Sequence, residues 1–314
     1  MPAPPNRFPG AIRLFRFAGI DVFLHWTWAL IAVVAFQARL GVYESEFWNV
    51  AEYLTLFAIV LTHEFGHALA CRSVGGRADR ILLWPLGGVA YVDPPRRPGA
   101  VLWSIAAGPL VNVALIPITL GALALAPRLL PGISNDLSDY LVSIAAINIF
   151  LLLFNLLPIY PLDGGQILQS ILWFFIGLPK SLAVASVVGI IGAAGVIVFA
   201  IASGDMWLIV LAIFGISRSL GGLKSARALA AMYRIPRRDD ARCPHCREFA
   251  PAGAIWRCRC GGAFDALSPY GQCPRCGSAP AVIPCPFCNE SEPPSAWRVT
   301  PTPTRVEWAR VVEE

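Results

Sequence analysis

The residues His63-Glu64-Phe65-Gly66-His67 have the types and the spacing of a hydrolytic metal site. On a helix, two histidines four positions apart lie on one face, where both imidazoles can ligate a zinc ion. Glu64 lies beside them and is placed to act as a general base toward a water molecule. The pattern predicts zinc-dependent hydrolysis with His63 and His67 as ligands.

The apolar surroundings of this motif argue against a chance match. The chain has 4 histidines, and two of them lie in the strongly apolar segment 50–71. Ionisable side chains are costly in such segments and mark functional sites there. A chance match on the exposed face of a soluble helix is therefore the weaker interpretation.

A catalytic zinc site usually has a third protein ligand, and two kinds of candidate remain in the chain. The third ligand is either His25 or a carboxylate. Most acidic residues fall at or beyond the ends of apolar segments, whereas Asp163 follows a helix break at Pro158 and Pro161. Such a break at membrane depth is tolerated only where the backbone lines a cavity or is buried in protein. Asp163 is the favoured ligand, and capping a helix that begins near Gly165 is its alternative role.

The composition is that of an integral membrane protein. Hydrophobic residues make up 56% of the 314 residues and charged residues 14%, with a mean hydropathy of +0.60. A membrane helix needs about 20 apolar residues. We expect an α-helical polytopic protein with about six transmembrane helices, at residues 22–40, 50–72, 100–126, 137–157, 181–202 and 206–220. A further apolar piece, 164–178, follows the proline break.

The positions of Lys and Arg between these segments predict the orientation of the chain. One set of alternate connections carries most of them, namely Arg7, Arg13, Arg16, Arg72, Arg77, Arg80, Arg96, Arg97, Lys180 and Arg218. The other set carries only Arg39 and Arg128. The positive-inside rule then places both termini in the cytoplasm. It also puts His63, His67 and Asp163 at matching depth in the cytoplasmic half of the membrane.

These patterns predict five regions. Residues 1–19 are expected to be a cytoplasmic leader without a cleaved signal, 20–222 a membrane-embedded domain and 223–242 a basic linker. Residues 243–288 form a cysteine-rich module, and the proline-containing residues 289–314 are expected to be a flexible tail.

Residues 80–92, between the second and third spans, contain two short β-prone runs around Gly87 and Gly88. They predict a small β-hairpin at the membrane surface, with an ordinary loop as the alternative. The free edge of such a hairpin could hold an unwound peptide segment as an added strand.

Eight of the 9 cysteines form close pairs in the C-terminal region: Cys243 and Cys246, Cys258 and Cys260, Cys273 and Cys276, and Cys285 and Cys288. We expect two all-thiolate structural zinc sites, most simply with the first two pairs in one and the last two in the other. Disulfides and ligation by His245 are weaker alternatives, the former because the cytoplasm is reducing. The module resembles a tandem zinc ribbon, and Cys71 is expected to be a buried hydrophobe.

The chain resembles the site-2 proteases, a family of polytopic intramembrane zinc metalloproteases. The resemblance rests on H-E-F-G-H at 63–67, A-A-G-P-L-V-N at 106–112 and N-x-x-P-x-x-P-L-D-G-G at 155–165. It covers about residues 12–222 and implies a structural role near the site for Asn112. Many relatives carry a nucleotide-sensing domain at the C-terminus; this chain departs from that pattern, so nucleotide control is not carried over.

The resemblance implies one catalytic zinc ion held by His63, His67 and Asp163. Glu64 would act as the general base that takes a proton from a zinc-bound water. This would help the water to attack the scissile peptide bond. Asn155 would hold or polarise the substrate carbonyl, with helix packing as its alternative role.

The same resemblance implies regulated proteolysis in a bacterial or archaeal cell membrane, with lipids and the transmembrane segments of other proteins as partners. We expect the zinc ribbon to dock a cytoplasmic protein; nucleic acid is not an expected partner, because the basic residues of the module are interleaved with acids. A noncatalytic scaffold that binds helices and recruits a partner through the zinc ribbon is the alternative. An intact Glu64 disfavours it.

Overall fold

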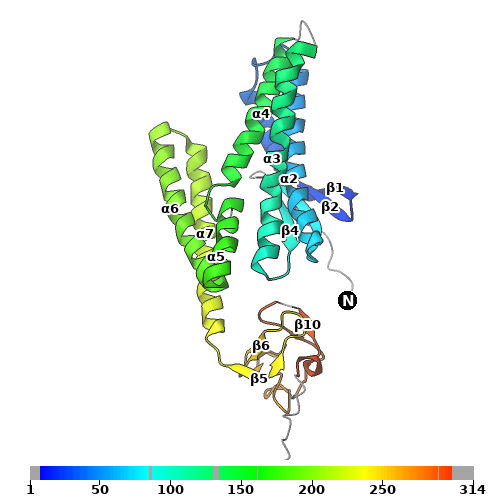
Figure 1. The fold of residues 1–314 in the computed structure, drawn as a ribbon, viewed down its shortest axis with the longest axis vertical. Helices are drawn as coiled ribbons and strands as arrows, with labels where there is room; N and C mark the ends of the chain where they lie inside the picture. The colour runs from blue at the N-terminus through cyan, green and yellow to red at the C-terminus, as the bar shows by residue number, and fades with distance from the viewer. Residues whose placement is uncertain (1–7, 85–86, 130–133, 161, 289, 299–314) are drawn as a thin grey trace, which may run out of the picture. The chain divides into compact units, whose positions relative to one another are not determined.

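The computed structural model describes residues 8–84, 87–129, 134–160, 162–288 and 290–298. The chain forms two compact units, Met1–Ala228 and Leu229–Glu314. The helices are α1 (Trp28–Ala38), α2 (Glu46–Ser73), α3 (Pro98–Leu129), α4 (Asn135–Asn155), α5 (Asp163–Ile176), α6 (Leu178–Ser203) and α7 (Met206–Tyr233). In the first unit, α2, α3 and α4 run side by side, and α5 packs against α3 and α6 (Figure 1).

Five described helices, α2, α3, α4, α6 and α7, are long and apolar enough to cross a membrane. The expected span at residues 22–40 is wrong as a single helix. Its first residues belong to a strand, and α1 has 11 residues, about 16 Å at the α-helical rise. The apolar piece after the proline break is the separate helix α5, which has 14 residues.

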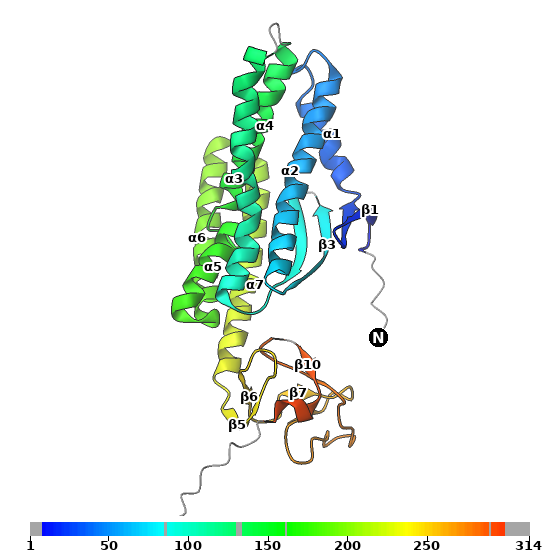
Figure 2. The same ribbon diagram turned by 45° about the vertical axis from the view of Figure 1, so that its right-hand side comes forward.

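A four-stranded sheet packs beside α2 (Figure 2). Its strands are β1 (Ala11–Phe17), β2 (Ile20–His25), β3 (Arg77–Trp84) and β4 (Gly87–Asp93), in that order across the sheet. The expected hairpin is confirmed, because β3 and β4 pair antiparallel. Two further strands extend it, since β2 pairs parallel with β3 and antiparallel with β1. The edge strand β4 contacts α2.

The sheet forms because alternate residues of β2 and β3 are apolar and face α2. Ile20 and Val22 of β2 and Ile81 and Leu83 of β3 are fully buried in one cluster with residues of α2. Residues two apart on a strand lie on the same face, so these four side chains form one surface. Part of the expected leader is therefore ordered structure, the strand β1; residues 1–7 lie outside the described residues.

Helix α2 has defined ends, which fix the position of the histidine motif along the bundle. The Ser45 hydroxyl caps its start by accepting a hydrogen bond from the Phe47 amide. The Asp136 carboxylate, at the start of α4, accepts hydrogen bonds from the amides of Glu44 and Ser45, 2.8 and 3.0 Å away. Beyond its C-cap, Gly75 adopts a φ of 85°, a conformation that ends many helices.

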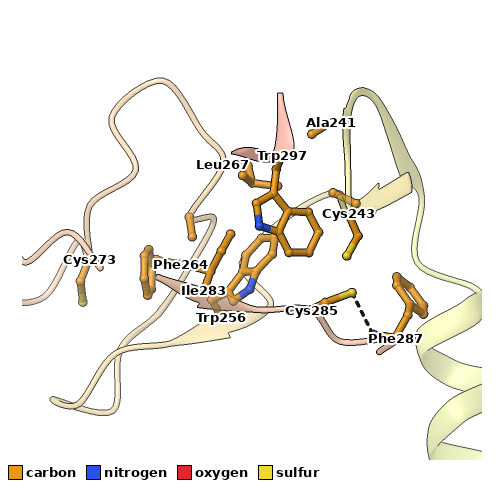
Figure 3. Close-up of a cluster of buried hydrophobic side chains, with 12 residues drawn as sticks. Ala241, Cys243, Trp256, Phe264, Leu267, Cys273, Ile283, Cys285, Phe287 and Trp297 are labelled. Atoms are coloured by element: carbon orange, nitrogen blue, oxygen red, sulfur yellow. Dashed lines mark hydrogen bonds between the residues drawn. The ribbon is translucent and has the colours of Figure 1, made fainter. Parts of the chain in front are cut away.

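The described residues of the second unit form three two-stranded hairpins around a small core. The pairs are β5 (Arg237–Arg242) with β6 (Phe249–Pro251), β7 (Trp256–Arg257) with β8 (Ala263–Phe264), and β9 (Ile283–Pro284) with β10 (Ser291–Glu292). A 3-10 helix, Pro294–Trp297, follows. Trp256 and Trp297 pack together at the centre, with Phe264 and Ile283 in the same cluster (Figure 3).

The expectation of a flexible tail from residue 289 is wrong for residues 290–298. Strand β10 and the 3-10 helix lie in this range, and Trp297 is 1% exposed. A buried tryptophan contributes a large apolar surface to a small core, which explains why the chain folds back. Residues 289 and 299–314 lie outside the described residues.

Candidate metal centres

His63, His67 and Asp163 lie together inside the first unit. His63 and His67 are on one face of α2, and Asp163 is the first residue of α5. The Asp163 Oδ2 atom is 3.1 Å from His63 Nε2 and 3.4 Å from His67 Nε2, and the two Nε2 atoms are 3.1 Å apart. All three residues are buried. The structure thus brings together the three residues expected from the sequence.

The outer nitrogens of both imidazoles have oxygen partners that define their tautomers. His67 Nδ1 is 2.9 Å from the backbone carbonyl of Ser104, and His63 Nδ1 is 2.6 Å from the side-chain oxygen of Asn112. Each of these oxygens accepts a hydrogen bond, so each Nδ1 carries the hydrogen. In the neutral imidazoles both Nε2 atoms then have a free lone pair.

These tautomers leave three electron-pair donors directed at one point. Among the described residues, no hydrogen-bond donor is found for the buried Asp163 Oδ2 atom. Two imidazole lone pairs and a carboxylate oxygen repel one another unless a cation lies between them. The donor set is one that zinc prefers, and the Nδ1 contacts are of the kind that orient histidine ligands. The group could therefore hold a zinc ion.

Glu64, the second residue of the motif, is buried beside this group and contacts β4. Its Oε2 atom accepts a hydrogen bond of 2.7 Å from the Ala90 amide. A Cβ added at Gly88 would lie 2.6 Å from Glu64 Oε1, so a glycine is needed where the strand passes the carboxylate. The edge strand β4 therefore fixes the position of Glu64.

Glycines bring α3 close to the histidine motif. A Cβ added at Gly108 would overlap the His67 ring and lie 2.7 Å from His63 Nε2, and one added at Gly66 would lie 2.8 Å from the Ala107 carbonyl. The A-A-G-P-L-V-N segment thus provides both the space for the imidazoles and the amide of Asn112. From the sequence, only Asn112 of this segment is expected to have a role near the site.

The chain before Asp163 turns sharply after α4 ends at Asn155. The N-cap of α5 is Leu162 without a side-chain hydrogen bond, so the alternative role of Asp163 as a helix cap is not observed. Cβ atoms at Gly164 and Gly165 would meet the Leu157 carbonyl and the Tyr160 amide at 2.5 and 2.6 Å. The two glycines let α5 begin directly against this turn; Pro161 lies outside the described residues.

A slot of small residues in α6 and α7 holds the same turn. We call it the glycine slot; it consists of Gly189, Gly192, Gly215, Ser219 and Gly222. The Ser219 hydroxyl donates a hydrogen bond of 2.8 Å to the Tyr160 carbonyl. Ile159 packs in a buried cluster with Ala193 and Ala212. The slot thus anchors the backbone three residues before Asp163.

The sequence also offers His25 as a metal ligand and Asn155 as a residue that contacts the substrate. His25 ends β2, and its Nδ1 atom contacts the Thr27 hydroxyl at 2.5 Å, so it is not part of the group. Asn155 is half-buried at the end of α4. Asn148, buried on α4, was missed from the sequence; its side-chain oxygen accepts a hydrogen bond from Asn112.

Comparisons with known proteins agree with this geometry. Residues 51–130 and 130–199 match the model of peptidase family M50. The chain is 34% identical over 204 residues to a zinc metalloprotease of Methanocaldococcus jannaschii, covering 65% of this chain and 58% of that protein. The solved structure of a site-2 protease from the same organism matches with a TM-score of 0.50 and 30% identity, over 68% of this chain and 95% of that one.

The chain belongs to the site-2 proteases of peptidase family M50. A further relative is the zinc metalloprotease Rip3 of Mycobacterium tuberculosis, which is 35% identical over 178 residues, 52% of this chain and 44% of Rip3. The chain thus spans about half the length of the curated relatives it matches. The M50 match includes the histidine motif and Asp163, and it ends before the cysteine pairs.

Outside the M50 match, the cysteine pairs form two groups, but not those expected. One group contains Cys243, Cys246, Cys285 and Cys288, and the other Cys258, Cys260, Cys273 and Cys276. The expected grouping of consecutive pairs is therefore corrected to a nested one, in which the first pair joins the last. Close contacts between sulfur atoms, from 3.5 to 3.8 Å, link the pairs within each group.

The nested arrangement follows from the hairpins. The first pair lies in the connection of β5 to β6 and the last in the connection of β9 to β10, and the intervening chain forms the other group. His245 Nε2 forms a hydrogen bond of 2.7 Å with the Glu292 carboxylate, and His245 belongs to neither group. Across a group, the Cys285 thiol lowers the pKa of Cys246 to about 5. The Arg275 amide lowers the pKa of Cys273 to about 7. The contact that lowers the pKa of Cys246 also raises the pKa of the Cys285 thiol, so the low pKa of one thiol depends on its neighbour keeping a proton.

Proposed function

We propose that this chain is an intramembrane zinc metalloprotease that hydrolyses a peptide bond in or near the transmembrane segment of a membrane-protein substrate. The observation that carries the proposal is the convergence of His63, His67 and Asp163 on one point inside an apolar helical unit, with Glu64 buried beside them. Membership of family M50 supports the same activity.

In this proposal His63, His67 and Asp163 hold the catalytic zinc. A bound zinc ion supplies Lewis acidity, which makes a water molecule acidic enough to attack at neutral pH and polarises the scissile carbonyl. Glu64 takes the proton of the attacking water and returns it to the leaving amine. Its hydrogen bond to the Ala90 amide holds one carboxylate oxygen and leaves the other for proton transfer.

The edge strand β4 is the proposed binding surface for an unwound substrate. Peptide amides alternate in direction along a strand, and the Ala90 amide points to Glu64. The side of β4 that is free of β3 therefore faces the catalytic carboxylate. A substrate segment added there as a strand would bring its carbonyls near Glu64, with Asn155 as a candidate donor to them.

The remaining features extend this proposal to the cell. The bias of Lys and Arg between the spans supports cytoplasmic termini in a bacterial or archaeal membrane, with the site opening to cytoplasmic water. The two thiolate groups are then two structural zinc sites, and the ribbon module docks a cytoplasmic protein.

The deciding experiment is co-expression of the full chain with candidate single-span membrane proteins, comparing the wild type with Glu64→Gln. We expect cleavage products only with the wild type and equal zinc contents, because the substitution removes the base and retains the ligands. Products that persist with Glu64→Gln would refute the catalytic assignment. Equal substrate capture without cleavage in both would favour the noncatalytic scaffold.

A further inference from the structure

A chain of buried amides leads from α4 to the histidine motif. Asn148 and Asn112 are 0% exposed, on α4 and α3. The Asn148 amide nitrogen donates to the Asn112 backbone carbonyl at 3.0 Å, and the Asn112 amide nitrogen donates to the Asn148 side-chain oxygen at 2.9 Å. The Asn112 side-chain oxygen is 2.6 Å from His63 Nδ1. We call the side chains of Asn148, Asn112 and His63 the amide relay.

The orientation of the two amide groups in the amide relay is set at Asn148, the residue farthest from the metal ligands. A backbone carbonyl only accepts hydrogen bonds, so the Asn148 nitrogen must face it and the Asn148 oxygen must face Asn112. The Asn112 nitrogen then faces Asn148, and its oxygen faces His63. His63 Nδ1 must therefore carry the hydrogen, which leaves the lone pair on Nε2, the atom that faces His67 and Asp163.

The two histidines differ in the kind of group that accepts the Nδ1 hydrogen. The partner of His67 Nδ1 is the backbone carbonyl of Ser104, which no side-chain substitution removes. The partner of His63 is an amide that could face either way, because its oxygen and nitrogen have nearly the same shape. If the Asn112 amide were reversed, its nitrogen would donate to Nδ1 and the His63 hydrogen would move to Nε2, where it would block a metal.

We propose that Asn148 is a positioning residue for the catalytic metal, which acts through Asn112 to fix the metal-binding tautomer of His63. The inference rests on the proposed function, since it takes the group of His63, His67 and Asp163 as the catalytic zinc site. Contacts of this kind around metal ligands are typically worth about 10- to 100-fold in metal affinity. A plain polar clamp between α3 and α4 would affect stability instead.

The first test is the Asn148→Leu variant of the full chain, which has a similar volume and no amide. Zinc affinity is measured by chelator competition, with Asp163→Ala giving the background of the ribbon sites. We call the group of His63, His67 and Asp163 the membrane site. We expect the dissociation constant for zinc at the membrane site to rise about 10- to 100-fold. Tyr140→Phe is the matched control, because it removes a polar contact of 2.7 Å between α4 and Thr55 of α2 and leaves the amide relay intact. It should bind zinc like the wild type.

The second test separates a positioning role from a structural one. Adding Asn112→Asp to Asn148→Leu gives His63 a carboxylate, which accepts the Nδ1 hydrogen in either orientation. The double variant should recover most of the zinc affinity, whereas loss of a structural clamp would not be repaired by a buried charge. Unchanged affinity in Asn148→Leu, or no recovery in the double variant, would overturn the inference. Absence of membrane-site zinc from the wild type itself would instead refute the proposed function.

Discussion

At the residue scale, Gly108 decides whether the two imidazoles fit beside α3. A methyl group there would overlap the His67 ring and approach His63 Nε2 to 2.7 Å. Gly108→Ala should therefore displace both rings and lower zinc affinity at the membrane site by roughly 10-fold or more. Gly121→Ala is the control on the same helix, since nothing lies within 4 Å of its added Cβ. Chelator competition on both variants checks this, and equal affinities would contradict the packing described.

Removal of Asp163 tests the third ligand directly. Asp163→Ala leaves two imidazoles without a carboxylate, so the membrane site should lose its metal while both thiolate groups keep theirs. Zinc analysis of the purified full chain should thus show about one ion fewer per chain. Asp205→Ala, which removes the exposed hydrogen bonds that Asp205 accepts from the Trp207 and Leu208 amides, is the control. An unchanged zinc content in Asp163→Ala would point to another ligand.

The sequence predicted the members of the histidine and aspartate group because each has a local signal. His63 and His67 have ligand spacing on a helix, and Asp163 follows a proline break. Asn148 and Gly108 have no such signal, since their roles depend on which faces of α2, α3 and α4 meet. Helical periodicity indicates that a face is buried and does not identify the residue opposite it.

At the element scale, the glycine slot connects α6 and α7 to the metal site. A Cβ at Gly189 would lie 2.8 Å from the Tyr160 amide, which is backbone and has little freedom to move. Gly189→Ala should shift the turn that begins α5 and lower zinc affinity at the membrane site by about 10-fold. Gly195→Ala, also in α6, has open space and should keep that affinity, with a gain of about 0.5–1 kcal/mol in helix stability. Equal zinc affinities in the two variants would show that the slot serves helix packing alone.

The hairpin and the break after α4 could be predicted because turn residues and prolines act locally. The pairing of β2 with β3 was missed for a different reason. Val22 pairs with Ile81, far along the chain, and no local pattern reports such a parallel pairing. A short apolar run followed by a helix also has the composition of one membrane span, so the sequence pattern predicts a single helix over residues 22–40.

At the scale of the whole molecule, the chain combines an M50 unit with a separate module whose topology the sequence left open. Four cysteine pairs indicate two sites, and they do not reveal which pairs share an ion. Assigning consecutive cysteine pairs to one ion is the simplest assumption. It fails here because the two middle pairs form one site, and they lie in the chain between the first and last pairs, which form the other. The nested grouping brings the chain from residue 285 back to the first pair, which also explains why Trp297 is part of the core.

Two double substitutions separate the nested grouping from the consecutive one. Cys243→Ser with Cys285→Ser removes two ligands from one nested site, so the module should lose about one zinc ion and keep the other. Cys243→Ser with Cys258→Ser removes one ligand from each nested site, so both ions should bind weakly. Consecutive grouping predicts the reverse for the two variants. The measurement is zinc per full chain after exposure to a chelator, and the same loss in both would contradict two independent sites. Since a module of this size depends on its metals for stability, the first variant should also keep a partial thermal transition that the second lacks.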